Sequence, residues 1–174
     1  MNTQDIPKVA LHDHLDGGLR PQTLIELADA VDMVLPERNP AQLAELVAAR
    51  AAAGSLPGYL EAFEWTVGVM QNVASITRVA REAVIDLADD GVVLAELRFG
   101  PMLCTAGGLS PEAVIAAVEQ GVREGREEAG NSIEVGLLLC GLRHIDEFAK
   151  IRRLFEQHYL RPGSLVVGVD LAGP

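Results

Sequence analysis

Four short apolar runs, each ending in polar residues or glycine, are spaced along the chain and predict four β-strands. They cover Val9–Leu15, Val92–Phe99, Ile133–Leu142 and Leu165–Ala172. None of the runs alternates cleanly between apolar and polar residues, which is typical of parallel strands that are buried on both faces. We therefore expect one parallel sheet.

Helical patterns fill the intervals between the strands. Apolar residues recur at helical spacing from Ser75 to Asp90, and Gly91 follows where a C-cap belongs. Ser110 before Pro111 is a typical helix start, and a further amphipathic pattern runs from Ile145 to Leu160. The first interval is much longer and predicts about three helices, over Pro21–Val31, Pro40–Ala53 and Leu56–Gln71.

Alternating strands and helices predict an α/β fold with a parallel sheet. Four such units are half of a TIM (β/α)₈ barrel, which takes about 250 residues, and a helical insertion after the first strand would lie on the active-site face. We expect residues 1–174 to form a single domain. The sequence stops at Pro174, where a loop after the fourth strand should begin, and so resembles a truncated barrel. Self-association through the open edges of the first and fourth strands is the corresponding expectation.

Composition and net charge limit the classes of function that the chain can have. Hydrophobic residues make up 49% of the chain, enough for a sizeable core. The net charge of −11 without a Lys/Arg cluster argues against a nucleic-acid surface. No apolar run approaches the roughly 20 residues of a membrane span, and the first residues do not resemble a signal peptide. We expect a cytoplasmic protein in which Cys104 and Cys140 are buried free thiols.

The strongest chemical signal lies at the end of the first strand, where His12, His14 and Asp16 are followed by Gly17-Gly18. Residues two apart on a strand project from the same face, so both imidazoles can point at one ion. Neutral imidazole is a common zinc donor. The glycine pair then lets the chain turn. This spacing predicts a metal site.

The surrounding residues resemble the opening of the adenosine deaminases, which are zinc enzymes of the amidohydrolase type built on a TIM barrel. The resemblance begins with Pro7-Lys8 and His12-Asp13-His14-Leu15-Asp16-Gly17-Gly18. It continues in the family's order through Ser55–Phe63, Ala95–Phe99, Leu142–His144 and Val169–Gly173. It covers essentially the whole chain but only the first half of a family member.

The resemblance implies a reaction and a role for several residues. The reaction is the hydrolytic deamination of adenosine or 2′-deoxyadenosine to inosine or 2′-deoxyinosine and ammonia, in purine salvage. His12 and His14 would be ligands of one zinc ion per complete active site, and His14 would also border the substrate. Asp16 would hold the ribose 5′-hydroxyl, and the backbone N–H of Gly173 would meet the purine. Leu56, Tyr59 and Phe63 would form the apolar wall of the nucleoside pocket.

Each role has a structural alternative. His12 and His14 also fit hydrogen-bonded barrel histidines, while Asp16 and Gly173 fit turn residues. The spacing of Leu56, Tyr59 and Phe63 is also that of core packing. At the strand ends, Glu96, Arg98, His144 and Asp170 are expected to form salt bridges or to support their neighbours, and His158 to lie on the surface.

Several parts of the family's active site have no match in the chain. The third zinc histidine, the glutamate of an H-A-G-E motif, a further histidine and an Asp-Asp pair belong to later strands of the family. We therefore expect the general acid beyond Pro174, no catalytic residue within the chain, weak metal binding, and an inactive, aggregation-prone fragment. Two alternatives stay open: an adenine or other purine deaminase of the same fold, and a non-catalytic half-barrel that serves as a binding or assembly module.

Overall fold

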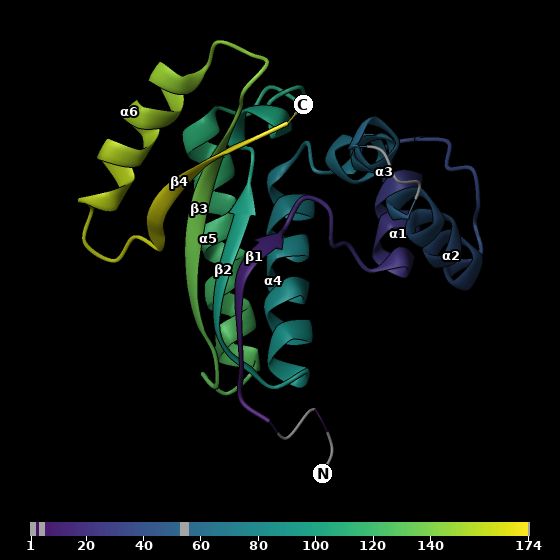
Figure 1. The fold of residues 1–174 in the computed structure, drawn as a ribbon, viewed down its shortest axis with the longest axis horizontal. Coiled ribbons are helices and arrows are strands. Elements are labelled where there is room, and N and C mark those ends of the chain that lie inside the picture. The colour runs from purple at the N-terminus through teal and green to yellow at the C-terminus, as the bar shows by residue number, and fades with distance from the viewer. Residues whose placement is uncertain (1–2, 4–5, 53–55, 174) are drawn as a thin grey trace.

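A sheet of four parallel strands forms the centre of the molecule (Figure 1). The computed structural model describes residues 3, 6–52 and 56–173, without the side chains of residues 51 and 56–62. The strands follow one another across the sheet in chain order: β1 (Lys8–His14), β2 (Val92–Phe99), β3 (Glu134–Leu142) and β4 (Val166–Ala172). Their register places His14 beside Arg98 and Cys140 beside Asp170. The four predicted strands are confirmed to within two residues at each end.

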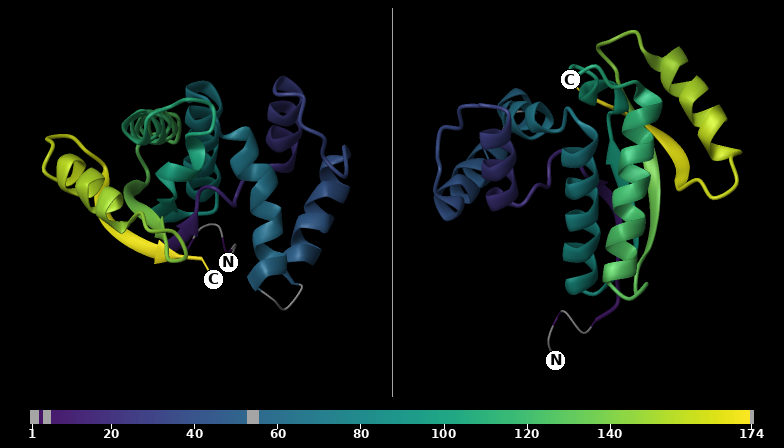
Figure 2. Two further views of the ribbon diagram at one scale, coloured as in Figure 1. Left: turned by 90° about the horizontal axis from the view of Figure 1, so that it is seen from above. Right: turned by 180° about the vertical axis from the view of Figure 1, so that it is seen from behind.

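One face of the sheet is covered by helices. Seen from behind, α4 (Val73–Asp89) and α5 (Pro111–Glu128) lie in front of the strands (Figure 2), and α6 (Phe148–Tyr159) packs beside β3 and β4. Side-chain oxygens cap two of the helix starts, because Asn72 accepts a hydrogen bond from Ser75 N and Ser110 accepts one from Ala113 N. The Asn72 cap starts α4 two residues before the predicted Ser75, and α6 begins at Phe148 rather than at Ile145.

Helices α4 and α5 approach each other at two glycines. A Cβ atom on Gly121 would lie 2.2 Å from the carbonyl oxygen of Thr77, and one on Gly125 would lie 2.6 Å from that of Arg81. Both distances are too short for real carbon and oxygen atoms. The absence of a side chain at these positions therefore allows the two helix backbones to lie in contact.

A second group of helices lies to one side of the sheet, between β1 and α4 in sequence. It consists of α1 (Pro21–Ala30), α2 (Pro40–Ala51) and α3 (Leu56–Val69), which we call the helical cap (Figure 1). The predicted insertion after the first strand is confirmed. A short 3₁₀ turn, η2 (Pro101–Cys104), follows β2.

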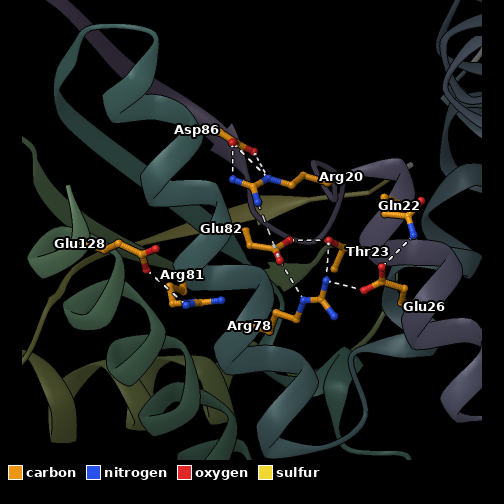
Figure 3. Close-up of polar contacts among 9 residues, drawn as sticks. All are labelled: Arg20, Gln22, Thr23, Glu26, Arg78, Arg81, Glu82, Asp86 and Glu128. Carbon is orange, nitrogen blue, oxygen red and sulfur yellow. Dashed lines mark hydrogen bonds and ion pairs between the residues drawn. The ribbon is translucent and has the colours of Figure 1, made fainter. Parts of the chain in front are cut away.

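Polar side chains join the helical cap to α4 (Figure 3). Glu82 of α4 is 6% exposed and accepts a hydrogen bond from Thr23 of α1 at 2.5 Å and one from Arg78 at 2.8 Å. Arg78 also donates to Glu26 of α1 at 2.7 Å, and Arg20 donates to Asp86 at 2.6 Å. A buried carboxylate is costly unless it is paired, and Glu82 is held from both helices.

The core lies between the sheet and the covering helices, and Cys104 and Cys140 are buried free thiols as predicted. The expectation that the strands are buried on both faces is wrong for β1, β2 and β4. Val9 and Leu11 of β1 are 55% and 57% exposed, and Val169 of β4 is 44% exposed. Leu94 of the central strand β2 is also 42% exposed, because helices cover one face of the sheet and leave the other open.

The surface position predicted for His158 is also wrong. Its side chain is 6% exposed, because His158 continues the stripe of Ile151 and Leu154 along the buried side of α6. Within the described ranges, no helix is both long enough and apolar enough to cross a membrane.

Candidate active site

A cavity opens where the carboxyl ends of the strands meet. Its volume is about 370 Å³. In a parallel α/β barrel this edge carries the loops that bind substrate. Residues from all four strands and from the helical cap line it: His12, His14, Asp16, Phe63, Arg98, Gly100, Leu103, Cys140, Leu142, Arg143, His144, Leu171, Ala172 and Gly173.

The two histidines of β1 lie side by side on the wall of this cavity. Their ring centroids are 5.3 Å apart with an interplanar angle of 62°. His14 is half-buried and also meets the Phe63 ring edge-on, with 5.8 Å between centroids. The predicted projection of both imidazoles from one strand face is therefore observed.

Arg98 of β2 connects His12 to the far edge of the sheet. Its side chain is 3% exposed, and Nη1 lies 3.0 Å from Nδ1 and 2.5 Å from Nε2 of His12. Nη2 forms an ion pair with Asp170 of β4 and lies 3.5 Å from Cys140 Sγ. The salt-bridging role predicted for Arg98 and Asp170 is observed.

The charge of Arg98 affects the protonation of His12. The guanidinium is the largest cause that lowers the pKa of His12, followed by desolvation and by the neighbouring His14. A lowered pKa favours the neutral imidazole near neutral pH. The neutral ring is the form that donates a lone pair to a metal ion.

Asp16 is held in the cavity with one oxygen unpaired. The residue is 5% exposed, and Oδ2 accepts a hydrogen bond from the backbone N–H of Gly100 at 3.1 Å. Oδ1 is buried, accepts no hydrogen bond from the described residues, and lies 3.7 Å from Nδ1 of His14. A buried acceptor without a partner suits a hydroxyl donor from a ligand.

One of the three predicted wall residues is placed. Phe63 of α3 lines the cavity and is half-buried. A Cβ atom on Gly17 would lie 2.7 Å from Cζ of Phe63, so the glycine after Asp16 lets the ring lie on the turn. The side chains of Leu56 and Tyr59 lie outside the described residues.

Gly173 follows β4 at the rim of the cavity. Its φ of +94° is in the left-handed region, which favours glycine, and a Cβ atom there would lie 2.8 Å from Nδ1 of His144. His144 is exposed and lines the cavity beside it. Both residues predicted at these strand ends therefore reach the site.

The donor set fits part of a zinc centre. A catalytic zinc usually has three protein ligands, and His12 and His14 supply two imidazoles on one face. Among the described residues, no group of three or more His, Cys, Asp or Glu side chains is arranged to hold a metal ion. The site therefore offers two side chains of the kind that zinc binds.

The sequence pattern does not indicate the contacts made by Thr66 of α3 and by Gln71, which follows α3. Thr66 Oγ1 donates to the backbone oxygen of Asp16 at 2.5 Å, and Gln71 bonds to the loop after β2. Both interactions join segments more than 30 residues apart. No local pattern of apolar or charged residues marks such a contact in the sequence.

The comparisons with known proteins agree with this architecture. The apo structure of the N6-methyl-AMP deaminase from Arabidopsis thaliana has a TM-score of 0.75 and 30% identity, over 98% of this chain and 50% of that chain. An amidohydrolase from Burkholderia ambifaria with bound zinc has a TM-score of 0.78 over 98% of this chain and 45% of that chain. At 20% identity the likeness to it concerns the fold alone. The fold is the first half of a TIM-barrel deaminase of the amidohydrolase type.

Sequence similarity narrows the class to a family. Residues 7–174 match the family model described as adenosine deaminase. A protein named adenosine deaminase from Mycolicibacterium gilvum (strain PYR-GCK) is 47% identical over 176 residues, which cover 99% of this chain and 48% of the relative. The chain belongs to the adenosine deaminase family. It spans about half the length of the relatives that it matches.

Proposed function

We propose that this chain is the amino-terminal half of a zinc-dependent adenosine deaminase. The complete enzyme would convert adenosine or 2′-deoxyadenosine to inosine or 2′-deoxyinosine and ammonia, in purine salvage in the cytoplasm. The observation that carries the proposal is the convergence of His12, His14 and Asp16 on one cavity at the carboxyl ends of the strands. Membership of the adenosine deaminase family supports it.

His12 and His14 would hold the zinc ion. When bound, zinc lowers the pKa of a water molecule and so supplies the nucleophile for hydrolysis. Arg98 would keep the His12 ring in place and neutral, because it contacts both ring nitrogens and is anchored to Asp170. Groups beside a metal-binding histidine commonly fix the orientation of its ring.

The remaining cavity residues would bind the nucleoside. Asp16 would accept a hydrogen bond from the ribose 5′-hydroxyl through its unpaired Oδ1. Phe63, with Leu56 and Tyr59, would cover the apolar purine, and the backbone N–H of Gly173 would meet the ring. His14 meets the Phe63 ring edge-on, so it would contact both the zinc ion and the substrate.

We propose that a general acid from the other half of the barrel completes the reaction, so that the 174-residue chain alone is inactive. The cavity walls described above contain a carboxylate in Asp16 but no glutamate. Asp16 is bonded to Gly100 and would be engaged by the ribose. The half-barrel would bind zinc weakly through its two imidazoles.

The first test measures zinc binding and adenosine turnover. The complete protein should release ammonia from adenosine in a zinc-dependent manner, and the 174-residue chain should not. His12→Ala should abolish turnover and zinc binding, whereas Leu11→Ala, at a neighbouring position that does not line the cavity, should preserve both. Asp16→Asn should raise KM for adenosine, and the matched Asp13→Asn should have little effect. Full activity of His12→Ala would overturn the metal assignment.

Another purine deaminase is the alternative within the same class. The 30% identity to an N6-methyl-AMP deaminase makes a nucleotide a second candidate substrate. Competition among adenosine, adenine and N6-methyl-AMP for the complete protein separates these substrates. We expect adenosine to have the highest kcat/KM.

A non-catalytic assembly module is the alternative from a different class. The exposed apolar residues of the edge strands, Val9, Leu11 and Val169, favour it. Concentration-dependent dimerisation without deaminase activity of the complete protein would support this alternative. Zinc-dependent turnover by the complete protein would exclude it as the main function.

A further inference from the structure

Gln71 makes hydrogen bonds with every polar atom of its side-chain amide. The residue is half-buried between the end of α3 and the start of α4. Nε2 donates to the carbonyl oxygens of Val67 at 2.7 Å and Leu103 at 3.0 Å. Oε1 accepts from the backbone N–H groups of Ala106 at 2.9 Å and Gly107 at 3.4 Å. Gln71 thus attaches the helical cap to the loop after β2.

The contact between these two segments is close. A Cβ atom on Gly107 would lie 2.1 Å from the backbone oxygen of Gln71. Gly107 therefore lets the loop backbone lie against the chain at Gln71, where the amide reaches three loop residues at once. The complete pairing of the amide makes this contact specific in geometry.

The same two segments are also tied to Asp16. The loop after β2 begins at Gly100, whose N–H donates to Asp16 Oδ2 at 3.1 Å. From the helical cap, Thr66 donates to the backbone oxygen of Asp16 at 2.5 Å and is 4% exposed. Together with the bonds of Gln71, these hydrogen bonds join α3, the loop after β2 and the turn at Asp16 to one another.

Two of the segments joined in this way carry apolar residues of the cavity wall. Phe63 lies on α3, and Leu103 lies in η2 within the loop, and both line the cavity. Gln71 does not line it. Its bonds fix the relative position of the two segments that carry these apolar walls.

We infer that Gln71 is a positioning residue that sets the separation of Phe63 and Leu103 and holds the Asp16 turn for the substrate. The importance of this role for the substrate rests on the proposed function. The attachment of the loop after β2 to the helical cap by Gln71 does not depend on the reaction. It can be measured without catalysis.

Cys104 provides a readout of the loop. It ends η2, is 0% exposed, and burial raises the pKa of its thiol to about 12, so it should react slowly with a disulfide reagent such as DTNB. In a Cys140→Ser background, Gln71→Leu should speed the reaction of Cys104 at least about tenfold, because removing several hydrogen bonds favours local opening. Gln120→Leu is the matched control, since Gln120 is exposed and bonds to Glu124 on its own helix.

Gln71→Glu distinguishes local opening of the loop from a general loss of folding. It keeps the size of the side chain and its acceptor oxygen but loses the two N–H donors to Val67 and Leu103. We expect faster Cys104 modification with an unchanged circular dichroism spectrum. Equal rates in Gln71→Leu, Gln71→Glu and Gln120→Leu would overturn the inference.

The complete protein supplies the functional readout. Gln71→Leu should raise KM for adenosine about tenfold and change kcat less, because the wall is displaced while the metal ligands are not. An unchanged KM in a variant whose Cys104 has become reactive would show that this wall does not position substrate, which also overturns the inference. If the wild-type protein does not act on adenosine at all, the proposed function fails while the thiol experiment still tests Gln71.

Discussion

The two faces of strand β2 serve different purposes. Ala95, Leu97 and Phe99 lie on the face that the helices cover, and they are 0%, 0% and 1% exposed. Leu94, Glu96 and Arg98 alternate with them on the opposite face. There Leu94 is 42% exposed, while Arg98 is buried by polar contacts with His12 and Asp170.

The difference shows how one strand combines stability with chemistry. The covered face is stabilised by removal of apolar area from water, which needs no specific partner. A charge on the open face must be paired to be buried, so each polar group there fixes the position of another. The geometry of the site therefore depends on charge pairing more than on packing.

The largest expected effect comes from removing apolar volume on the covered face. Leu97→Ala should lower the free energy of unfolding by about 3 kcal/mol, because it leaves a cavity in a fully buried site. The same substitution on the other face, Leu94→Ala, should cost less than about 1 kcal/mol because Leu94 is already partly in water. Urea unfolding of both variants tests this. Equal losses would refute the contrast between the faces.

A smaller effect is expected from the charge pair on the open face. Arg98→Met should lower the free energy of unfolding by about 2 kcal/mol, since Asp170 then loses its counter-charge but stays 30% exposed through its side chain. Asp170→Leu in the Arg98→Met background should recover part of this loss. The double-mutant cycle measures the coupling, and additive effects of the two substitutions would show that the pair contributes nothing.

The smallest expected effect concerns a polar group on the covered side. Burial is the main cause that lowers the pKa of His158, with a further contribution from Arg161 and opposition from Glu119 and Glu112. Its Nδ1 has no hydrogen-bond partner among the described residues. The unfolded chain therefore binds a proton more readily, and stability should fall as the pH drops below 6.5 and level off below the folded-state pKa.

His158→Phe should flatten this part of the pH dependence. Thermal unfolding between mildly acidic and neutral pH measures it. Gln157→Phe is the control, since Gln157 is exposed on the same helix and its side chain does not titrate, and it should keep the wild-type slope. A slope unchanged by His158→Phe would assign the acid sensitivity to other groups.

The sequence predicts the parts of the fold that local pattern determines. An apolar run that starts after Gly91 and ends before Gly100 locates β2 without error, because six of its eight residues are apolar and the glycines mark both ends. Ser110 followed by Pro111 likewise marks the start of α5. The spacing of His12 and His14 predicts their shared face for the same reason, since strand periodicity alone decides it.

Contacts between distant segments are not predictable in this way. The position of His158 on the buried side of α6 depends on how the helix rotates against the sheet, which the histidine itself does not indicate. The bonds of Gln71 depend on the path of a loop more than 30 residues away. Arg98 was expected to form a salt bridge, but its contact with His12 follows from the register of β1 and β2.

The glycine contact between α4 and α5 has a consequence for the packing behind the sheet. These helices precede and follow β2, and at Gly121 and Gly125 their backbones leave no room for a side chain between them. If one helix rotated or slid against the other, side chains would collide with the backbone of the partner helix. The two helices therefore restrain each other behind the sheet. The packing of α4 against α5 behind the sheet is therefore set by backbone contacts at glycines that do not line the cavity.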